Sequence, residues 1–319
     1  MAEKYICTKE TLKNTIEQYG VAIIPNVIDE KECESMYNHI WDFFTHITRE
    51  WDTPLSKLDT TTWREFYKLY PLHSMLIQYW GVGQCQASWN ARQHPKILEI
   101  FSYFWGCNPE DLLVSFDGLS LHLPPEITKK GWNRGNTWYH IDQSFTKDTF
   151  QCIQSFITTR DINEYDATLS VMEGSNKYHK EFCEEYNIQD KSDWCKISKT
   201  QEKFYLERGC AIKNITCPKG SLVFWDSRTI HCGIEADKRR DSPNVRAIIY
   251  LCYMPRVLCD SKNLKKKQKA FAELRTTNHY PCKIKLFPKA PRTYGNPLPS
   301  ITTISEPMLS DIGKKLAGF

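Results

Sequence analysis

Two histidines and one aspartate are the residues whose types and spacing most clearly suggest chemistry. His140 and Asp142 are separated by one residue in a short β-type run, and His231 ends a second such run much later in the chain. Because side chains alternate across a strand, His140 and Asp142 are expected to project to the same side. Two imidazoles and one carboxylate on one face are typical ligands of non-haem Fe(II) centres. The pattern therefore predicts that His140, Asp142 and His231 bind a catalytic metal.

A histidine and an aspartate one residue apart also occur by chance, so His140 could equally be a core residue. The order of the parts favours a metal centre: a His-x-Asp strand, further strands, a strand that ends in His-x-Gly, and then an arginine. His122, His179 and His279 compete with His231 for the distant position. We interpret all three as packing or surface residues, and His179 is the strongest rival because it lies in a turn near the predicted barrel rim.

Arg246 opens a β-type run in which Arg246 and Tyr250 face the same way. A guanidinium at the end of such a strand can bind a carboxylate through two parallel hydrogen bonds. The alternative is a surface arginine in a weak ion pair. Arg239 and Arg240 are closer to His231, but they lie in a charged loop that we expect to be solvated. Arg246 is therefore the predicted clamp for a dicarboxylate cosubstrate, which suggests Fe(II), 2-oxoglutarate and O₂ as the reacting partners.

The elements that must position these residues change in kind along the chain. Helical periodicity and capping residues predict helices over residues 8–19, 29–48 and 90–106, with a strand over 21–25. Short β-rich runs follow at residues 112–123, 137–142, 150–161, 167–173, 221–232 and 245–254. Strands without regular intervening helices favour a sandwich or barrel over βαβ units. We expect a mainly β domain with flanking helices.

The chain of 319 residues is predicted to form a single domain, 1–319. Its parts are an N-terminal support (1–111), a β core (112–258) with a polar insert (176–209), and a basic extension containing prolines (259–319). The 13 cysteines are scattered without a C-x-x-C pair, which favours reduced thiols in the cytoplasm or the nucleus. No apolar run approaches the length of a membrane span, and the net charge of +4 is too small to indicate nucleic acid.

Several segments together resemble the phytanoyl-CoA dioxygenase-like branch of the Fe(II)/2-oxoglutarate oxygenases. They are YGVAIIPNVIDEKE (19–32), WYHIDQS (138–144), DATLSVMEGSNKYH (166–179), GSLVFWDSRTIHCG (220–233) and VRAIIYLCYMPR (245–256). The resemblance covers roughly residues 10–256 and implies a double-stranded β-helix, which is a jelly roll of the cupin type.

The resemblance also assigns roles to individual residues. It implies that His140, Asp142 and His231 are the iron ligands and that Arg246 is the 2-oxoglutarate arginine. Gln154 and Phe156 fall on the strand that usually contributes to the cosubstrate pocket, and Thr229 is expected on the same face as His231.

The implied reaction is hydroxylation with release of succinate and CO₂, or demethylation through a hydroxymethyl intermediate. A small-molecule or lipid-like substrate suits the family and the aromatic residues that we expect beside the mouth, namely Trp132, Trp138, Tyr139 and Phe145. One alternative is an oxygenase acting on nucleic acid or protein, for which the lysines of segment 262–269 are the only indication. A second is a Zn-dependent hydrolase or isomerase on the same barrel, and a third is a silent binding protein.

Overall fold

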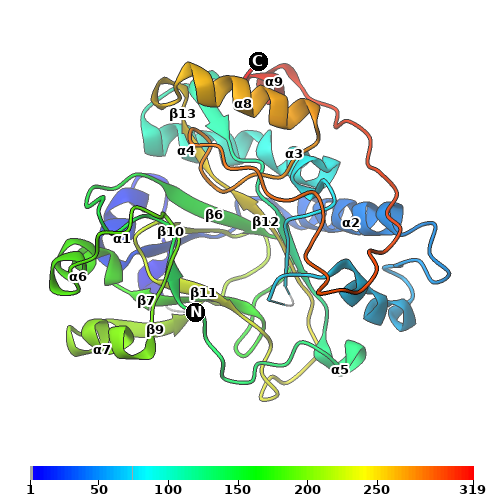
Figure 1. Cartoon of the computed structure of the whole chain (residues 1–319), viewed down its shortest axis with the longest axis horizontal. Coiled ribbons are helices and arrows are strands. Elements are labelled where there is room, and N and C mark those ends of the chain that lie inside the picture. Colours follow the sequence, from blue (N-terminus) through cyan, green and yellow to red (C-terminus); the bar gives the residue numbers. More distant parts are fainter. Residues whose placement is uncertain (1–2, 74) are drawn as a thin grey trace.

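Two antiparallel sheets pack together at the centre of the molecule, and helices cover their outer faces (Figure 1). The computed structural model describes residues 3–73 and 75–319. The first sheet contains, in spatial order, β1 (Val21–Ile24), β10 (Leu222–Asp226), β6 (Ile153–Thr158), β12 (Arg246–Leu251), β4 (Leu119–His122) and β2 (Leu76–Ile77). The second contains β8 (Cys195–Lys196), β5 (His140–Ile141), β11 (His231–Ile234), β7 (Thr168–Glu173) and β9 (Ala211–Asn214). A separate pair joins β3 (Leu112–Val114) to β13 (Tyr253–Pro255).

Alternation along the strands divides the core into layers. On β10, Val223 and Trp225 face the space between the two sheets, where they meet Val171 of the second sheet. Leu222 and Phe224 point the other way, into a larger core beneath the helices. Because both faces of the first sheet are covered, apolar side chains project from both sides of β10. The predicted jelly-roll class with flanking helices is confirmed.

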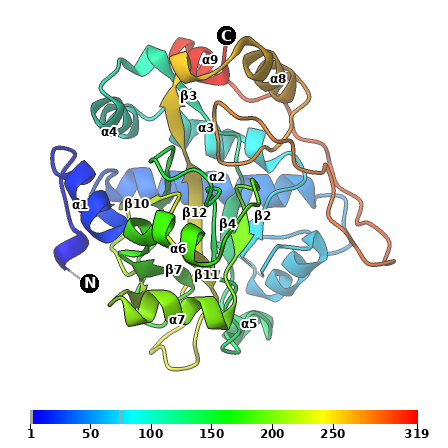
Figure 2. The ribbon, with the colours of Figure 1, turned by 60° about the vertical axis from the view of Figure 1, so that its left-hand side comes forward.

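The helices form two groups around this double sheet. The first group packs on the outer face of the first sheet and consists of α1 (Leu12–Tyr19), α2 (Glu30–Ile47), α3 (Gln86–Arg92) and α4 (Pro95–Trp105). The polar insert supplies α6 (His179–Glu185) and α7 (Lys199–Glu207), which lie over β7 and β11 in Figure 2. The remaining helices are α5 (Pro125–Thr128), α8 (Ser261–Ala272) and α9 (Asp311–Ala317). Short 3-10 turns occupy Glu3–Tyr5, Thr60–Leu69, Val82–Gln84, Pro109–Asp111, Ser175–Tyr178 and Arg256–Leu258.

Three expectations about the elements need correction. The helix predicted over 90–106 is two helices, because Pro95 cannot continue the helix and His94 before it is extended. The runs 112–123 and 221–232 each break into two strands that belong to different sheets. The lysine-rich segment 262–269 is not a wholly solvated face: it forms α8, and Lys267 is buried with its Nζ on the carbonyl of Val114.

Two further observations concern the chain as a whole. All 13 cysteines are free thiols. Within residues 3–73 and 75–319, no helix has both the length and the apolar character needed to cross a bilayer.

Candidate metal centre and cosubstrate pocket

The three predicted metal ligands meet where two neighbouring inner strands of the second sheet, β5 and β11, pair. His140 on β5 and His231 on β11 are directly paired across the antiparallel ladder, and Asp142 follows β5 immediately. Their ligand atoms all lie within 4.8 Å of one another. The Nε2 atom of His231 is 3.3 Å from Asp142 Oδ2, and the Nε2 atom of His140 is 3.8 Å from Asp142 Oδ1. This donor set matches the two-histidine, one-carboxylate arrangement of non-haem iron.

Hydrogen bonds orient both imidazoles with Nε2 toward the carboxylate. His140 Nδ1 lies 3.2 Å from the Trp138 carbonyl, and His231 Nδ1 lies 2.9 Å from the Thr229 carbonyl. Since a carbonyl only accepts, each Nδ1 must carry the proton, which leaves a lone pair on each Nε2.

The protonation states of the cluster also suit a cation. Burial, together with the neighbouring His231, lowers the pKa of His140 to about 3. Burial would raise the pKa of Asp142, but the imidazoles of His279 and His140 outweigh it and hold this pKa below its usual range. A neutral imidazole and an ionised carboxylate are the forms that bind metals.

Side chains from other elements hold Asp142 in place. Gln154 on β6 donates from Nε2 to Asp142 Oδ2 at 3.0 Å. The Tyr280 hydroxyl donates to the Asp142 carbonyl at 3.1 Å, and the Asp142 amide donates to the Ser227 carbonyl at 3.2 Å. Gln154 was predicted to contact the cosubstrate; in the structure it lines the cavity and its amide is directed at the carboxylate.

The substitution Gln154→Met tests whether Gln154 positions Asp142 for metal binding. We expect Fe(II) affinity to fall about 10- to 100-fold, the usual cost of removing a partner that orients a ligand. Anaerobic Fe(II) titration measures this, with the half-saturating 2-oxoglutarate concentration measured in parallel. Unchanged Fe(II) affinity with weakened 2-oxoglutarate binding would instead favour the direct cosubstrate role.

Thr229 supports the centre from outside the cavity. Its hydroxyl donates to the Gly20 carbonyl at 2.8 Å, and its own carbonyl holds His231. Gly20 has a φ of +76°, and a Cβ there would lie 2.5 Å from the Thr229 hydroxyl oxygen, so only glycine fits. Thr229 was expected on the same face as His231, as one of the residues of the cosubstrate pocket. In the structure β10 ends at Asp226, a turn separates it from β11, and Thr229 is not among the residues that line the cavity.

A cavity of about 710 Å³ contains the metal cluster, and Arg246 lines the same cavity. Arg246 is 3% exposed, and its Nε and Nη1 atoms have no hydrogen-bond partner among the described residues. Its guanidinium lies 5.3 Å from the ring centroid of Phe156. A buried guanidinium without an acceptor is costly unless a ligand supplies one. A carboxylate of the cosubstrate would fit this requirement, and Phe156 acts as the surface beneath the arginine.

The other histidines and arginines considered in the sequence lie outside the metal cluster. His179 lies outside the metal cluster and donates from Nε2 to the Ser144 carbonyl at 3.0 Å. His122 is buried on β4, where it pairs with Arg246 of β12 in the antiparallel ladder. His279, interpreted above as a surface or packing residue, instead lines the cavity.

Arg240, expected to be solvated, is buried and paired with Glu126 and Asp166. No local sequence pattern predicts that His279 lines the cavity or that Arg240 pairs with Glu126 and Asp166.

The expected aromatic mouth is only partly present. Trp138 lines the cavity and stacks on His140, with ring centroids 4.6 Å apart. Tyr139 and Phe145 are buried in the cluster beneath α6 and α7, because alternation turns Tyr139 away from the cavity. Trp194 and Trp225, which the sequence did not single out for the cavity, also line it.

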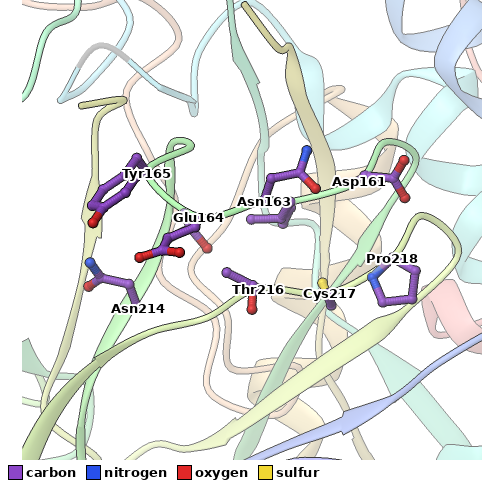
Figure 3. A pocket seen from close by; sticks show the side chains of 10 residues that line it. Asp161, Asn163, Glu164, Tyr165, Asn214, Thr216, Cys217 and Pro218 are labelled. Atoms are coloured by element: carbon purple, nitrogen blue, oxygen red, sulfur yellow. The ribbon is translucent and has the colours of Figure 1, made fainter. Parts of the chain in front are cut away.

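A second hollow, of about 570 Å³, lies away from these residues and is shown in Figure 3. Asp161, Glu164, Tyr165, Asn214 and Cys217 line it, and none of the three clustered ligands does. The Asp161 carboxylate already accepts from the Lys219 amide. This hollow is not part of the candidate metal centre.

Comparison with known proteins identifies the family. The phytanoyl-CoA dioxygenase (PhyH) family matches residues 16–236, a stretch that includes His140, Asp142 and His231 and ends before Arg246. The chain therefore belongs to the phytanoyl-CoA dioxygenase family, whose members are enzymes that use Fe(II) and 2-oxoglutarate. The resemblance stated from the sequence is confirmed.

Individual relatives are more distant. The chain is 28% identical over 213 residues to Ava biosynthesis cluster protein O of Aspergillus versicolor, a match that covers 64% of this chain and 65% of that protein. The chain thus spans slightly less than two thirds of that relative's length.

Solved structures show a similar fold at low sequence identity. Hypothetical protein JW0805 of Escherichia coli superposes with a TM-score of 0.59 and 13% identity, over 99% of this chain and 85% of that one. GIG2, the product of GlcNAc inducible gene 2 of Candida albicans, gives a TM-score of 0.52 and 15% identity, over 83% of this chain and 67% of that one. These likenesses concern the fold alone.

Proposed function

We propose that this protein is an Fe(II)- and 2-oxoglutarate-dependent dioxygenase that hydroxylates a small-molecule or lipid-like substrate and releases succinate and CO₂. The observation that carries the proposal is the convergence of His140, Asp142 and His231 in a cavity that Arg246 also lines. The buried Nε and Nη1 atoms of Arg246 have no hydrogen-bond partner among the described residues. Iron bound by three protein ligands keeps open positions at which 2-oxoglutarate and O₂ can bind and react.

Each residue contributes a separate physical effect. The triad binds the cation on one face, and Gln154 fixes the carboxylate. Arg246 orients the distal carboxylate of 2-oxoglutarate through two parallel hydrogen bonds. Trp138 packs against His140 and limits the access of water to the ligand. The carboxylate of Asp142 occupies the place that is small in related halogenases, which favours hydroxylation, or demethylation through a hydroxymethyl product.

Three observations favour this function over the alternatives. A Zn-dependent hydrolase on the same barrel would have no use for Arg246 as a dicarboxylate clamp. The lysine-rich segment, which was the indication of a macromolecular substrate, is weakened as an interface because Lys267 is buried. The relative from Aspergillus versicolor is described as a biosynthesis cluster protein, which agrees with a small-molecule substrate. We also propose that residues 1–319 act as one oxygenase domain.

Succinate formation tests the proposed function directly. Purified protein supplied with Fe(II), ascorbate, O₂ and 2-oxoglutarate should form succinate slowly even without a prime substrate. A metal chelator should abolish this turnover because it removes the iron. Zn(II) in place of Fe(II) should also abolish it, because zinc does not activate O₂. Absence of succinate under all supplemented conditions, in protein that binds Fe(II), would contradict the proposal.

A further inference from the structure

Residues 276–287, here named the C-terminal loop, return to the cavity from beyond the matched family region. The loop follows α8 in the chain and is closed by an antiparallel bridge between Thr277 and Leu286 (Figure 1). The Phe287 amide donates to the Thr276 carbonyl at 3.0 Å, which closes the base of the loop. This internal bonding gives the loop a defined shape.

Contacts with three distant elements attach the loop to the site. Thr277 and Phe116 exchange two hydrogen bonds, of 2.8 and 3.2 Å, at the base of the loop. Tyr280 donates to the Asp142 carbonyl, so the loop touches the metal-binding segment itself. Lys283 forms an ion pair with Asp193 of the polar insert, which also pairs with Lys147 at 2.6 Å. The loop is thus a fixed wall of the cavity.

The surface that this wall presents is apolar with a positive edge. Ile284 and Phe287 supply apolar area to the cavity lining. The loop contains Lys283 and Lys285 and no acidic residue. Asp193 is already shared between two lysines, whereas Lys285 is exposed and has no carboxylate within 4.0 Å of its Nζ among the described residues.

The other carboxylates that line the cavity already have partners. Asp117 accepts from the Gln78 amide and the Gly118 amide, and Asp142 belongs to the metal cluster. Arg246 is reserved for 2-oxoglutarate in the proposed function. Lys285 is therefore the cation of the cavity lining that neither the cosubstrate nor a protein carboxylate neutralises.

We infer that the C-terminal loop is the substrate-selecting wall of this enzyme and that it favours an organic anion with an apolar body. Lys285 pairs with the carboxylate or phosphate of that substrate, and Ile284 and Phe287 contact its apolar part. His279, whose Nε2 atom is buried and has no hydrogen-bond partner among the described residues, offers a further polar contact in the same cavity. This inference rests on the proposed function, because it assigns Arg246 to the cosubstrate.

Binding of matched probes tests the inference without turnover. The protein of residues 1–319 is loaded with Mn(II) and saturating 2-oxoglutarate, so that Arg246 is occupied and no reaction occurs. Octanoate, octyl phosphate and octanol are then titrated while the fluorescence of the cavity tryptophans is followed. We expect the better of the two anions to bind about two- to fivefold more tightly than octanol, the scale of one partly exposed ion pair. Whichever anion binds more tightly identifies the headgroup as carboxylate or phosphate.

Two lysine variants decide whether the C-terminal loop causes the preference for an anion over octanol. Lys285→Gln should remove the preference for the anion, while octanol binding stays unchanged. Lys262→Gln, which alters an exposed lysine of α8 outside the cavity lining, should retain the preference. Equal binding of the anions and octanol in the unmodified protein, or a preference that survives Lys285→Gln, would overturn the inference. Loss of succinate formation in the unmodified protein would instead count against the proposed function alone.

Discussion

Asp142→Ala is expected to abolish succinate formation and to weaken Fe(II) binding by more than about 100-fold. Removal of an outer-shell partner typically costs 10- to 100-fold in metal affinity, and loss of a ligand should exceed this range. The carboxylate supplies the negative charge of the cluster and lies within reach of both Nε2 atoms. Anaerobic Fe(II) titration and a succinate assay measure the two effects, and circular dichroism confirms that the variant is folded.

A second carboxylate of the cavity provides the matched control for Asp142. Asp117 is also buried and lines the same cavity, but it is not in the metal cluster. Asp117→Asn should therefore retain most of the Fe(II) affinity. Equal losses in Asp117→Asn and Asp142→Ala would show that the cavity acts through its overall charge, and full turnover in Asp142→Ala would remove that residue from the ligand set.

Arg246→Met is expected to raise the half-saturating 2-oxoglutarate concentration roughly 100-fold. Truncating one partner of a buried charged pair costs about 3 kcal/mol, and each 1.4 kcal/mol changes affinity tenfold. Fe(II) affinity measured without 2-oxoglutarate should change little, because Arg246 is not in the metal cluster. The succinate assay at varied 2-oxoglutarate concentration and the Fe(II) titration separate these effects.

The same variant has a second signature in thermal stability. The buried Nε and Nη1 atoms of Arg246 lack partners among the described residues, so methionine should leave the ligand-free protein equally stable or more stable. Added 2-oxoglutarate with Mn(II) should raise the Tm of the unmodified protein more than that of Arg246→Met. Arg239→Met, at an exposed arginine paired with Asp237, is the control and should change neither property. An unaltered 2-oxoglutarate requirement in Arg246→Met would exclude the clamp.

The metal centre could be predicted because its key relationship is local. One intervening residue places His140 and Asp142 on the same side of β5, and this follows from strand geometry alone. The partnership with His231 is a long-range pairing, and it was predicted from the order of strands and the family resemblance. The register that sets His231 opposite His140 became visible only in the structure.

The rest of the cavity could not be derived from local patterns. His279 and Lys285 reach the cavity because a bridge and side-chain bonds fold the C-terminal loop back, and no periodicity marks such a contact. Arg240 is buried by carboxylates from distant segments, although its charged neighbours suggested a solvated loop. Thr229 was misplaced because alternation was extended through residues that form a turn.

The most direct test of the central claim is anaerobic titration of Fe(II) into the protein, read as bound metal per chain. One Fe(II) should bind to each unmodified chain, and His231→Ala should lose that site because it removes the ligand that β11 brings to the other two. A chain that binds no Fe(II), or one that binds it equally well after His231→Ala, would contradict the assignment of His140, Asp142 and His231 as a single metal centre.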